Sequence, residues 1–319
     1  MRPIGMYAHH QGAGHLQRCR TIASRIDGPV TIFTSSEAAS SDDVLLPLDV
    51  AEQNPDADAD GMLHWAPLGV DGLRERMAIM ADWIRRNNPR AFYVDVSVEV
   101  TLFVRLMGVP VVTLAMPGER ADLPHQAGYR AASAILAAWP TLLDPPTHLG
   151  IFEPKLHAVG GISRFEGRSC AGRDRASVVV MFGHGGTDVP EHYWDDVAGA
   201  CPDYDFTVLS GTNRVDDPFP LLSRAGVVVS AAGQNSVADI AAARAPALFV
   251  AQDRAFDEQH ATVASLEGLG IARGLSDLPD PSEWQSLLDQ TARTQPNWGR
   301  WQVDGAARRA AAVIEEAAV

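Results

Sequence analysis

The chain has 319 residues, a formal net charge of −14 and a single lysine, Lys155. Its length is too great for one typical hydrophobic core and suits two α/β domains. The acidic balance argues against nucleic acid and anionic membranes as partners. The three cysteines lie far apart without C-x-x-C spacing, so neither a disulfide framework nor a zinc site is indicated. No apolar run reaches the length of an integral membrane segment, and we expect a cytoplasmic protein.

The first half alternates strand-like and helix-like patterns. Runs rich in β-branched and aromatic residues predict strands at 4–8, 30–34, 63–66, 91–96, 109–114 and 134–139. Helical patterns lie near 15–26, 73–87, 98–107 and 122–132. Such alternation predicts a parallel, doubly wound sheet.

The alternation stops at 140–166, which is rich in Pro and Gly, and then resumes. Strands are predicted at 177–182, 206–210, 226–230 and 247–251, and helices at 191–200, 235–243, 257–269 and 304–317. The predicted class is therefore α/β, with two Rossmann-like doubly wound parallel-sheet domains facing one cleft. We place the domains at 1–150 and 167–303, the linker at 151–166 and a C-terminal helix at 304–319.

A turn of small residues follows the strand predicted at 226–230. Gly233, Gln234, Asn235 and Ser236 open the next helix, where unpaired backbone N–H groups can hold a phosphate. Asp239 lies about one and a half turns further on, within reach of a ribose. This segment predicts a nucleotide site.

A second glycine-rich loop follows the strand at 177–182. Gly185 and Gly186 allow the backbone to approach a charged group closely, and the Thr187 hydroxyl can donate to phosphate. The alternative is a tight turn that needs glycine only for its backbone angles. Because both loops follow predicted strands, we expect them to converge on the cleft.

The first strand leads into a third glycine loop, Gly12-Ala13-Gly14-His15. Its glycines fit the dinucleotide fingerprint only in part, because Gln17 stands where the third glycine belongs, which disfavours an NAD enzyme. His15 lies at a helix N-terminus, which favours the neutral imidazole that a general base requires. Asp95, at the end of another strand, can orient it. The alternatives are that His15 only caps its helix and that Asp95 caps the following one.

These motifs together resemble the GT-B glycosyltransferases of the MurG kind, over nearly the whole chain. The resemblance rests on Gly12-x-Gly14-His15, the 183–187 loop, and Gly233 to Asp239 with Asp257-Glu258-Gln259. It implies metal-independent, inverting transfer from a nucleotide sugar, with UDP as the expected nucleotide and no further cofactor. By the same resemblance Asp239 takes the place of a ribose-binding Glu, and Gln259 that of a Gln that reads the donor sugar.

The acceptor side departs from that family. Where the family has His-Glu-Gln-Asn, this chain has Leu114-Ala115-Met116-Pro117-Gly118-Glu119-Arg120, so the peptidoglycan acceptor is not carried over. We expect an unidentified hydroxyl acceptor to contact Gly12, Gly14, Arg120 and His125. For Arg120 and His125 the alternative is ordinary surface charge.

Two other functions stay open. Gly12 to Cys19 and Gly185 to Asp188 also resemble the UDP-sugar hydrolase of the pseudaminic-acid pathway, in which the histidine of the first loop activates water. A non-catalytic nucleotide-sugar-binding protein would need the same donor residues. The sequence favours transfer, because the long loop at 115–125 suits an organised acceptor pocket.

Overall fold

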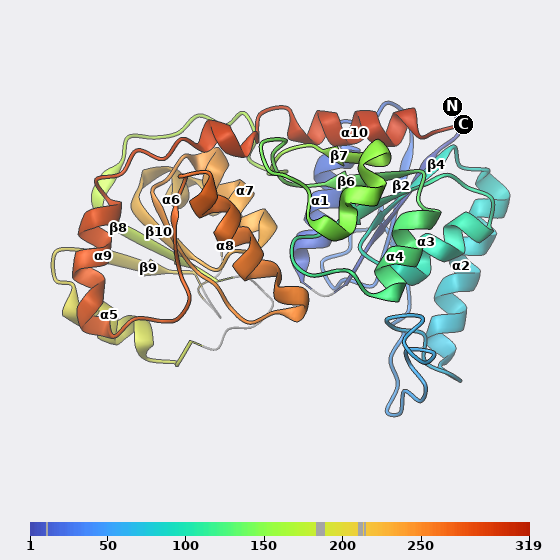
Figure 1. Cartoon of the computed structure of the whole chain (residues 1–319), viewed down its shortest axis with the longest axis horizontal. Helices are drawn as coiled ribbons and strands as arrows, with labels where there is room; N and C mark the ends of the chain where they lie inside the picture. The colour runs from blue at the N-terminus through green and yellow to red at the C-terminus, as the bar shows by residue number, and fades with distance from the viewer. Residues whose placement is uncertain (11, 183–188, 210–212, 214) are drawn as a thin grey trace.

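The computed structural model describes residues 1–10, 12–182, 189–209, 213 and 215–319. They form two lobes, each built on its own parallel sheet (Figure 1). The predicted α/β class with two doubly wound parallel sheets is confirmed. The division at residues 150, 166 and 303 stays a prediction.

The first sheet has the strand order β3-β2-β1-β4-β5-β6-β7. Each neighbouring pair is parallel. The strands are β1 (Ile4–Ala8), β2 (Val30–Thr34), β3 (Val44–Leu45), β4 (Ala91–Asp95), β5 (Val111–Ala115), β6 (Ala134–Ala137) and β7 (Leu156–Ala158). The helices between them are α1 (Ala13–Ala23), α2 (Asp71–Asn87), α3 (Val98–Leu106) and α4 (Leu123–Ala131), and the 3-10 helix Thr147–Lys155 precedes β7.

The second sheet has the order β12-β11-β10-β8-β9, again with parallel pairs. Its strands are β8 (Asp174–Met181), β9 (Asp205–Val208), β10 (Ala225–Ser230), β11 (Ala247–Val250) and β12 (Arg273–Leu275). The helices are α5 (Tyr193–Ala200), α6 (Phe219–Arg224), α7 (Gln234–Ala243), α8 (Glu258–Gly268) and α9 (Trp284–Thr291). Short 3-10 segments span Ala255–Asp257, Pro281–Glu283 and Trp298–Trp301.

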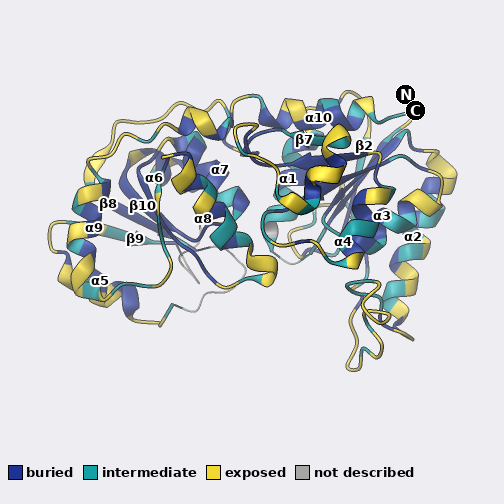
Figure 2. Ribbon diagram, in the orientation of Figure 1, coloured by how far each residue is buried: buried dark blue, intermediate teal, exposed yellow. Residues whose placement is uncertain are grey.

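The central strands are apolar at nearly every position. All residues of β10 are buried, as Figure 2 shows for the interior of both sheets. A parallel sheet that is covered on both faces needs apolar side chains in both directions, which explains the uninterrupted run Val227-Val228-Val229.

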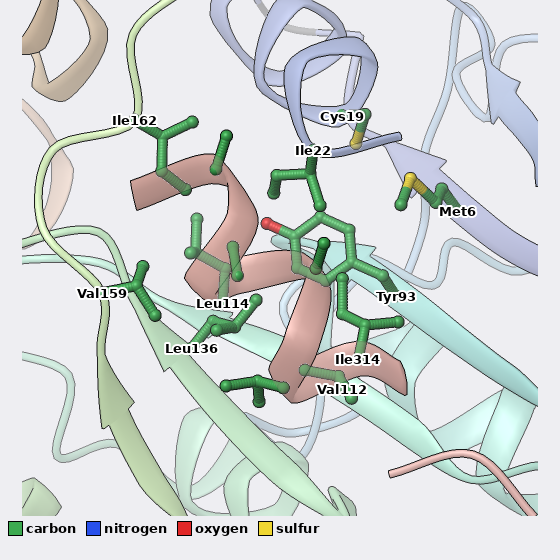
Figure 3. Close-up of a cluster of buried hydrophobic side chains, with 14 of the residues drawn as sticks. Met6, Cys19, Ile22, Tyr93, Val112, Leu114, Leu136, Val159, Ile162 and Ile314 are labelled. Atoms are coloured by element: carbon green, nitrogen blue, oxygen red, sulfur yellow. The ribbon is translucent and has the colours of Figure 1, made fainter. Parts of the chain in front are cut away.

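The last helix, α10 (Ala306–Glu316), packs on the first lobe although it follows the second in sequence. Ala307, Ala310 and Ile314 join the same buried cluster as Tyr93 and Leu136 (Figure 3). Their spacing of three and four residues forms one apolar stripe, and the alanines let the helix approach the strands closely. The two lobes are therefore tied by α10 as well as by the 159–166 segment.

One strand predicted from the sequence is absent, and a short strand lies where the sequence predicted only a linker. The strand predicted at 63–66 is wrong: these residues lie in the loop between β3 and α2, and the neighbour of β2 is the short strand Val44–Leu45. The segment predicted as linker includes β7, which pairs with β6 at the sheet edge. Three residues are too few to show strand periodicity. Within the described ranges, no helix is both long and apolar enough to span a membrane.

Candidate functional site

His15 and Asp95 meet where two neighbouring strands of the first sheet end. Ala8, the last residue of β1, pairs with Asp95, the last residue of β4. Gly12 (φ 84°) turns the chain into α1, which places His15 in the first helical turn. The distance between His15 Nδ1 and Asp95 Oδ1 is 2.8 Å. Asp95 does not cap α3, because Ser97 does so by accepting from the Val100 N–H.

Arg18 completes this cluster and was not identified as a site residue from the sequence. Its Nε and Nη2 donate to the two oxygens of Asp95 at 2.8 and 2.9 Å. Burial raises the pKa of Asp95, but Arg18 and then His15 outweigh burial and hold that pKa well below its ordinary value. The signal in the sequence is the spacing, since three residues after His15 is the same face of the helix.

The same arginine reaches the second lobe. Arg18 Nη1 donates to Gln234 Oε1 and Asn235 Oδ1, each at 3.2 Å. Asn235 Nδ2 in turn donates to the carbonyl of Gly14 at 2.7 Å. A Cβ on Gly14 would lie 2.7 Å from that amide nitrogen, so a larger residue there would push the Asn235 side chain away.

The N-terminus of α7 therefore lies against the N-terminus of α1. The side chains of Gln234 and Asn235, predicted to bind the donor, are used between the lobes. Gly233 is the N-cap of α7, and no side chain caps that helix end. This helix end can therefore bind an anion through its backbone N–H groups and through the half-buried Ser236.

Asp239 is buried on α7 behind that helix end. Ser163 Oγ donates to its Oδ1 at 2.6 Å, and Arg164 Nε lies 3.4 Å from its Oδ2. Burial raises the pKa of Asp239 to about 6, and Ser163 and Arg164 only partly oppose that effect. Ser163 and Arg164 lie in the predicted linker, where no sequence pattern marks them as site residues.

The other predicted donor residues have different outcomes. Gln259 is buried at the start of α8, and its Oε1 accepts from the Gln252 N–H at 3.0 Å. Gly185, Gly186 and Thr187 lie outside the described residues.

Arg120 and His125, predicted to contact an acceptor, lie together at the start of α4. Arg120 Nη1 donates to His125 Nε2 at 3.2 Å. Arg120 Nη2 lies 3.4 Å from Glu258 Oε2, and its guanidinium lies 4.5 Å from the ring centre of Phe256. Arg120 therefore contacts the second lobe, beside the donor-side segment that contains Gln259.

Two further histidines contribute to the surroundings of His15. The ring of His9 lies 5.9 Å from that of His15 and 4.7 Å from that of His10. Burial, followed by the nearby His15, lowers the pKa of His9 to about 3. His9 is therefore neutral at physiological pH and adds no positive charge beside His15.

His64, Asp122 and His125 form a cluster whose ligand atoms could surround a metal ion. Each of the two histidines is already paired with the carboxylate, at 3.0 Å for His64 Nε2 and 2.6 Å for His125 Nδ1. His125 accepts from Arg120 through Nε2, so its proton lies on Nδ1. A metal ion bound at Nδ1 would shift that proton to Nε2, where it would face the N–H of Arg120. The cluster is therefore a poor cation site.

A pocket lies between the lobes, next to the Arg18 network. It has residues of the first lobe on one side and of α7, α8 and the 298–301 segment on the other. The lining residues are Pro117, Gly118, Trp139, Leu143, Asp144, Pro146, Gln234, Ala261, Thr262, Ser265 and Trp301. The predicted cleft thus has a hollow that both lobes line.

No protein-family model matches the chain, and no curated protein matches it in sequence. Solved structures match along almost its entire length. A glycotransferase of kitacinnamycin has a TM-score of 0.67 at 17% identity, covering 99% of this chain and 98% of the other. Acinetobacter baumannii MurG has a TM-score of 0.63 at 13% identity, covering 99% and 100%.

A third match is UGT89C1 from Arabidopsis thaliana, solved with UDP-L-rhamnose. Its TM-score is 0.70 at 12% identity, and the alignment covers 100% of this chain and 99% of that chain. Identities this low establish shared architecture. The chain therefore has the two-domain GT-B fold found in glycosyltransferases.

Proposed function

We propose that the protein is a glycosyltransferase that moves a sugar from a UDP-linked donor to an acceptor hydroxyl, with inversion and without a metal ion. The proposal rests on one observation above all. A His–Asp pair at the carboxyl ends of the first sheet lies against an uncapped helix N-terminus of the second lobe, through Arg18 and Asn235. The proposed base and the proposed anion-binding helix end thus lie on opposite sides of one cleft.

His15 is the proposed base. With Nδ1–H donating to Asp95, the lone pair of His15 lies on Nε2, which takes the proton of the acceptor hydroxyl as that oxygen attacks the sugar C1. Arg18 already neutralises Asp95, so the carboxylate fixes the tautomer and orientation of the ring more than it supplies charge.

The leaving group is the nucleoside diphosphate. As the bond between C1 and the diphosphate oxygen breaks, negative charge develops on that oxygen, and the N–H groups at the start of α7 can stabilise it. Asp239 would accept hydrogen bonds from the ribose hydroxyls, and Gln259 would contact the sugar. The glycosyltransferases that share the fold support this division, and the structure solved with UDP-L-rhamnose supports a UDP-sugar donor.

The first test measures binding and turnover separately. We would titrate the protein with UDP-, GDP- and TDP-glucose by calorimetry, then incubate the best ligand with a library of hydroxylated small molecules. We expect UDP-sugar binding, and a new conjugate formed faster than free sugar. Release of free sugar at full rate without any acceptor would identify a hydrolase instead, and absence of nucleotide-sugar binding would contradict both.

A further inference from the structure

Phe256 of the second lobe packs against the first lobe, on a surface that we call the seat: Arg120, His125 and His64. The side chain comes from the 3-10 segment that precedes α8, and it contacts three residues of the first lobe. The guanidinium of Arg120 lies 4.5 Å from its ring centre, the ring of His125 lies 4.9 Å away at right angles, and the ring of His64 lies 5.7 Å away.

The backbone at this point is unusual. Phe256 and Asp257 both have left-handed backbone angles, with φ of 63° and 57°. Residues with a Cβ rarely adopt this region, and two in succession need support from their surroundings. Part of that support comes from the first lobe, because the Glu119 N–H donates to the Phe256 carbonyl at 2.8 Å.

Two features of the first lobe suit this contact: a glycine beside the Phe256 carbonyl, and hydrogen bonds that hold Arg120 and His125 in place. Gly118 has φ of 93°, and a Cβ there would lie 1.9 Å from the Phe256 carbonyl oxygen. Arg120 is held between His125 Nε2, at 3.2 Å, and Glu258 Oε2, at 3.4 Å. His125 is fixed in turn by donating from Nδ1 to Asp122 at 2.6 Å.

The docked segment leads directly into the first turn of α8, which carries Gln259. Glu258 accepts from Arg120, while Gln259 accepts from the Gln252 N–H. A change in the left-handed segment would therefore displace the residues proposed to contact the donor sugar. The nucleotide residues on α7 belong to a different element and do not depend on this contact.

We propose that Gly118 and Arg120 of the first lobe are positioning residues for the donor sugar, an inference that rests on the proposed function. They hold Phe256 and Asp257 in the left-handed conformation that presents Gln259. The loop that faces the acceptor thereby sets the affinity for the sugar part of the donor, and sugar recognition is complete only when the two lobes are docked.

The variants are Gly118→Ala, Arg120→Met and Arg120→Lys, with Gly61→Ala as the matched control. Gly61 also has a positive φ, 76°, but nothing lies within 4 Å of its Cβ position, so this control strains a loop without blocking a contact. For each protein we would measure the affinities for UDP, UDP-glucose and UDP-N-acetylglucosamine by calorimetry. Small-angle X-ray scattering of the ligand-free chain would give the radius of gyration.

We expect Gly118→Ala and Arg120→Met to weaken binding of the better nucleotide sugar by about tenfold or more, as after loss of a hydrogen bond to a charged group. UDP affinity should stay within about twofold, Arg120→Lys should recover part of the loss, and Gly118→Ala should enlarge the radius of gyration. Equal weakening of UDP and UDP-sugar, or no effect on either, would overturn the proposal.

Failure of the proposed function would look different. A wild-type chain that binds none of the three nucleotides contradicts the glycosyltransferase proposal itself. The scattering comparison needs no ligand, so an unchanged radius of gyration in Gly118→Ala overturns the docking role by itself.

Discussion

Two buried aspartates, one in each lobe, have opposite acid–base properties. Asp95 is completely buried and Asp239 is 8% exposed, so burial raises the pKa of both carboxyls. The pKa of Asp95 is nevertheless held well below its ordinary value, whereas the pKa of Asp239 stays raised, at about 6.

Their partners explain the difference. Arg18 forms two hydrogen bonds with Asp95 at 2.8 and 2.9 Å, and it is itself buried. Arg164 lies 3.4 Å from Asp239 and is 31% exposed, so water weakens its effect. A fully paired carboxylate is a fixed part of its site. An incompletely paired one has hydrogen-bonding capacity left for a ligand, which fits the ribose-binding role proposed for Asp239.

The largest expected effect concerns the Asp95 site, where His15 is the proposed base. His15→Gln should lower turnover by roughly 100- to 10,000-fold, the usual effect of losing a general base, because an amide cannot carry a proton at neutral pH. Nucleotide binding and the fold should persist, as measured by calorimetry and circular dichroism. A Gln variant with near wild-type turnover would make His15 structural and contradict its role as the base.

Removing the partner of Asp95 should have the next largest effect. Arg18→Met leaves a buried carboxylate without its cation, which should lower the free energy of unfolding by about 3–5 kcal/mol. Urea unfolding at pH 7.5 measures the change. The double variant Arg18→Met/Asp95→Asn should recover part of it. A single variant as stable as the wild type would show that Arg18 does not stabilise the charge of Asp95.

The same kind of change at Asp239 should affect binding instead. Asp239→Asn should weaken UDP binding by about 1–3 kcal/mol, because a charged hydrogen-bond acceptor is lost. The free energy of unfolding at pH 7.5 should not fall, since the variant no longer buries an ionised carboxylate. Asp217→Asn, at an exposed carboxylate paired with Arg168, is the control. Unchanged UDP affinity in the folded Asn variant would exclude Asp239 from the nucleotide site.

The comparison also predicts a pH dependence of stability. The pKa of Asp239 is about 6 in the folded chain, above the ordinary value of 3.8, so the folded state binds this proton more tightly. As pH falls from about 6 to 4, the wild type should therefore gain stability relative to Asp239→Asn. Comparison with that variant is essential, because His9 and His125, whose lowered pKa values are about 3 and 4, have the opposite effect in this range. If the free energies of unfolding of the wild type and Asp239→Asn differ by the same amount at every pH from 6 to 4, the pKa of Asp239 is not raised.

Much of the fold could be predicted because the signals are local. The apolar run at 227–229 and its small-residue turn predicted β10 and the start of α7, and the alternation predicted parallel sheets. The predicted strand at 63–66 failed because a short apolar stretch alone does not distinguish a strand from a packed loop. The pairing of His15 with Asp95 could also be predicted, because each follows or ends a strand and β1 and β4 are neighbours.

The sequence by itself determined the two doubly wound sheets, the place of His15 at a helix start and that of Asp95 at a strand end, because periodicity and turn chemistry act over a few residues. Only the tertiary structure decided which partners these groups have. Arg18 is 216 residues from Gln234, and Ser163 is 76 from Asp239. Arg120 likewise lies against Glu258, 138 residues away. The contacts of Arg18 and Arg120 with the second lobe depend on how the two lobes dock, and the pKa of each buried aspartate depends on partners whose distances no local pattern encodes.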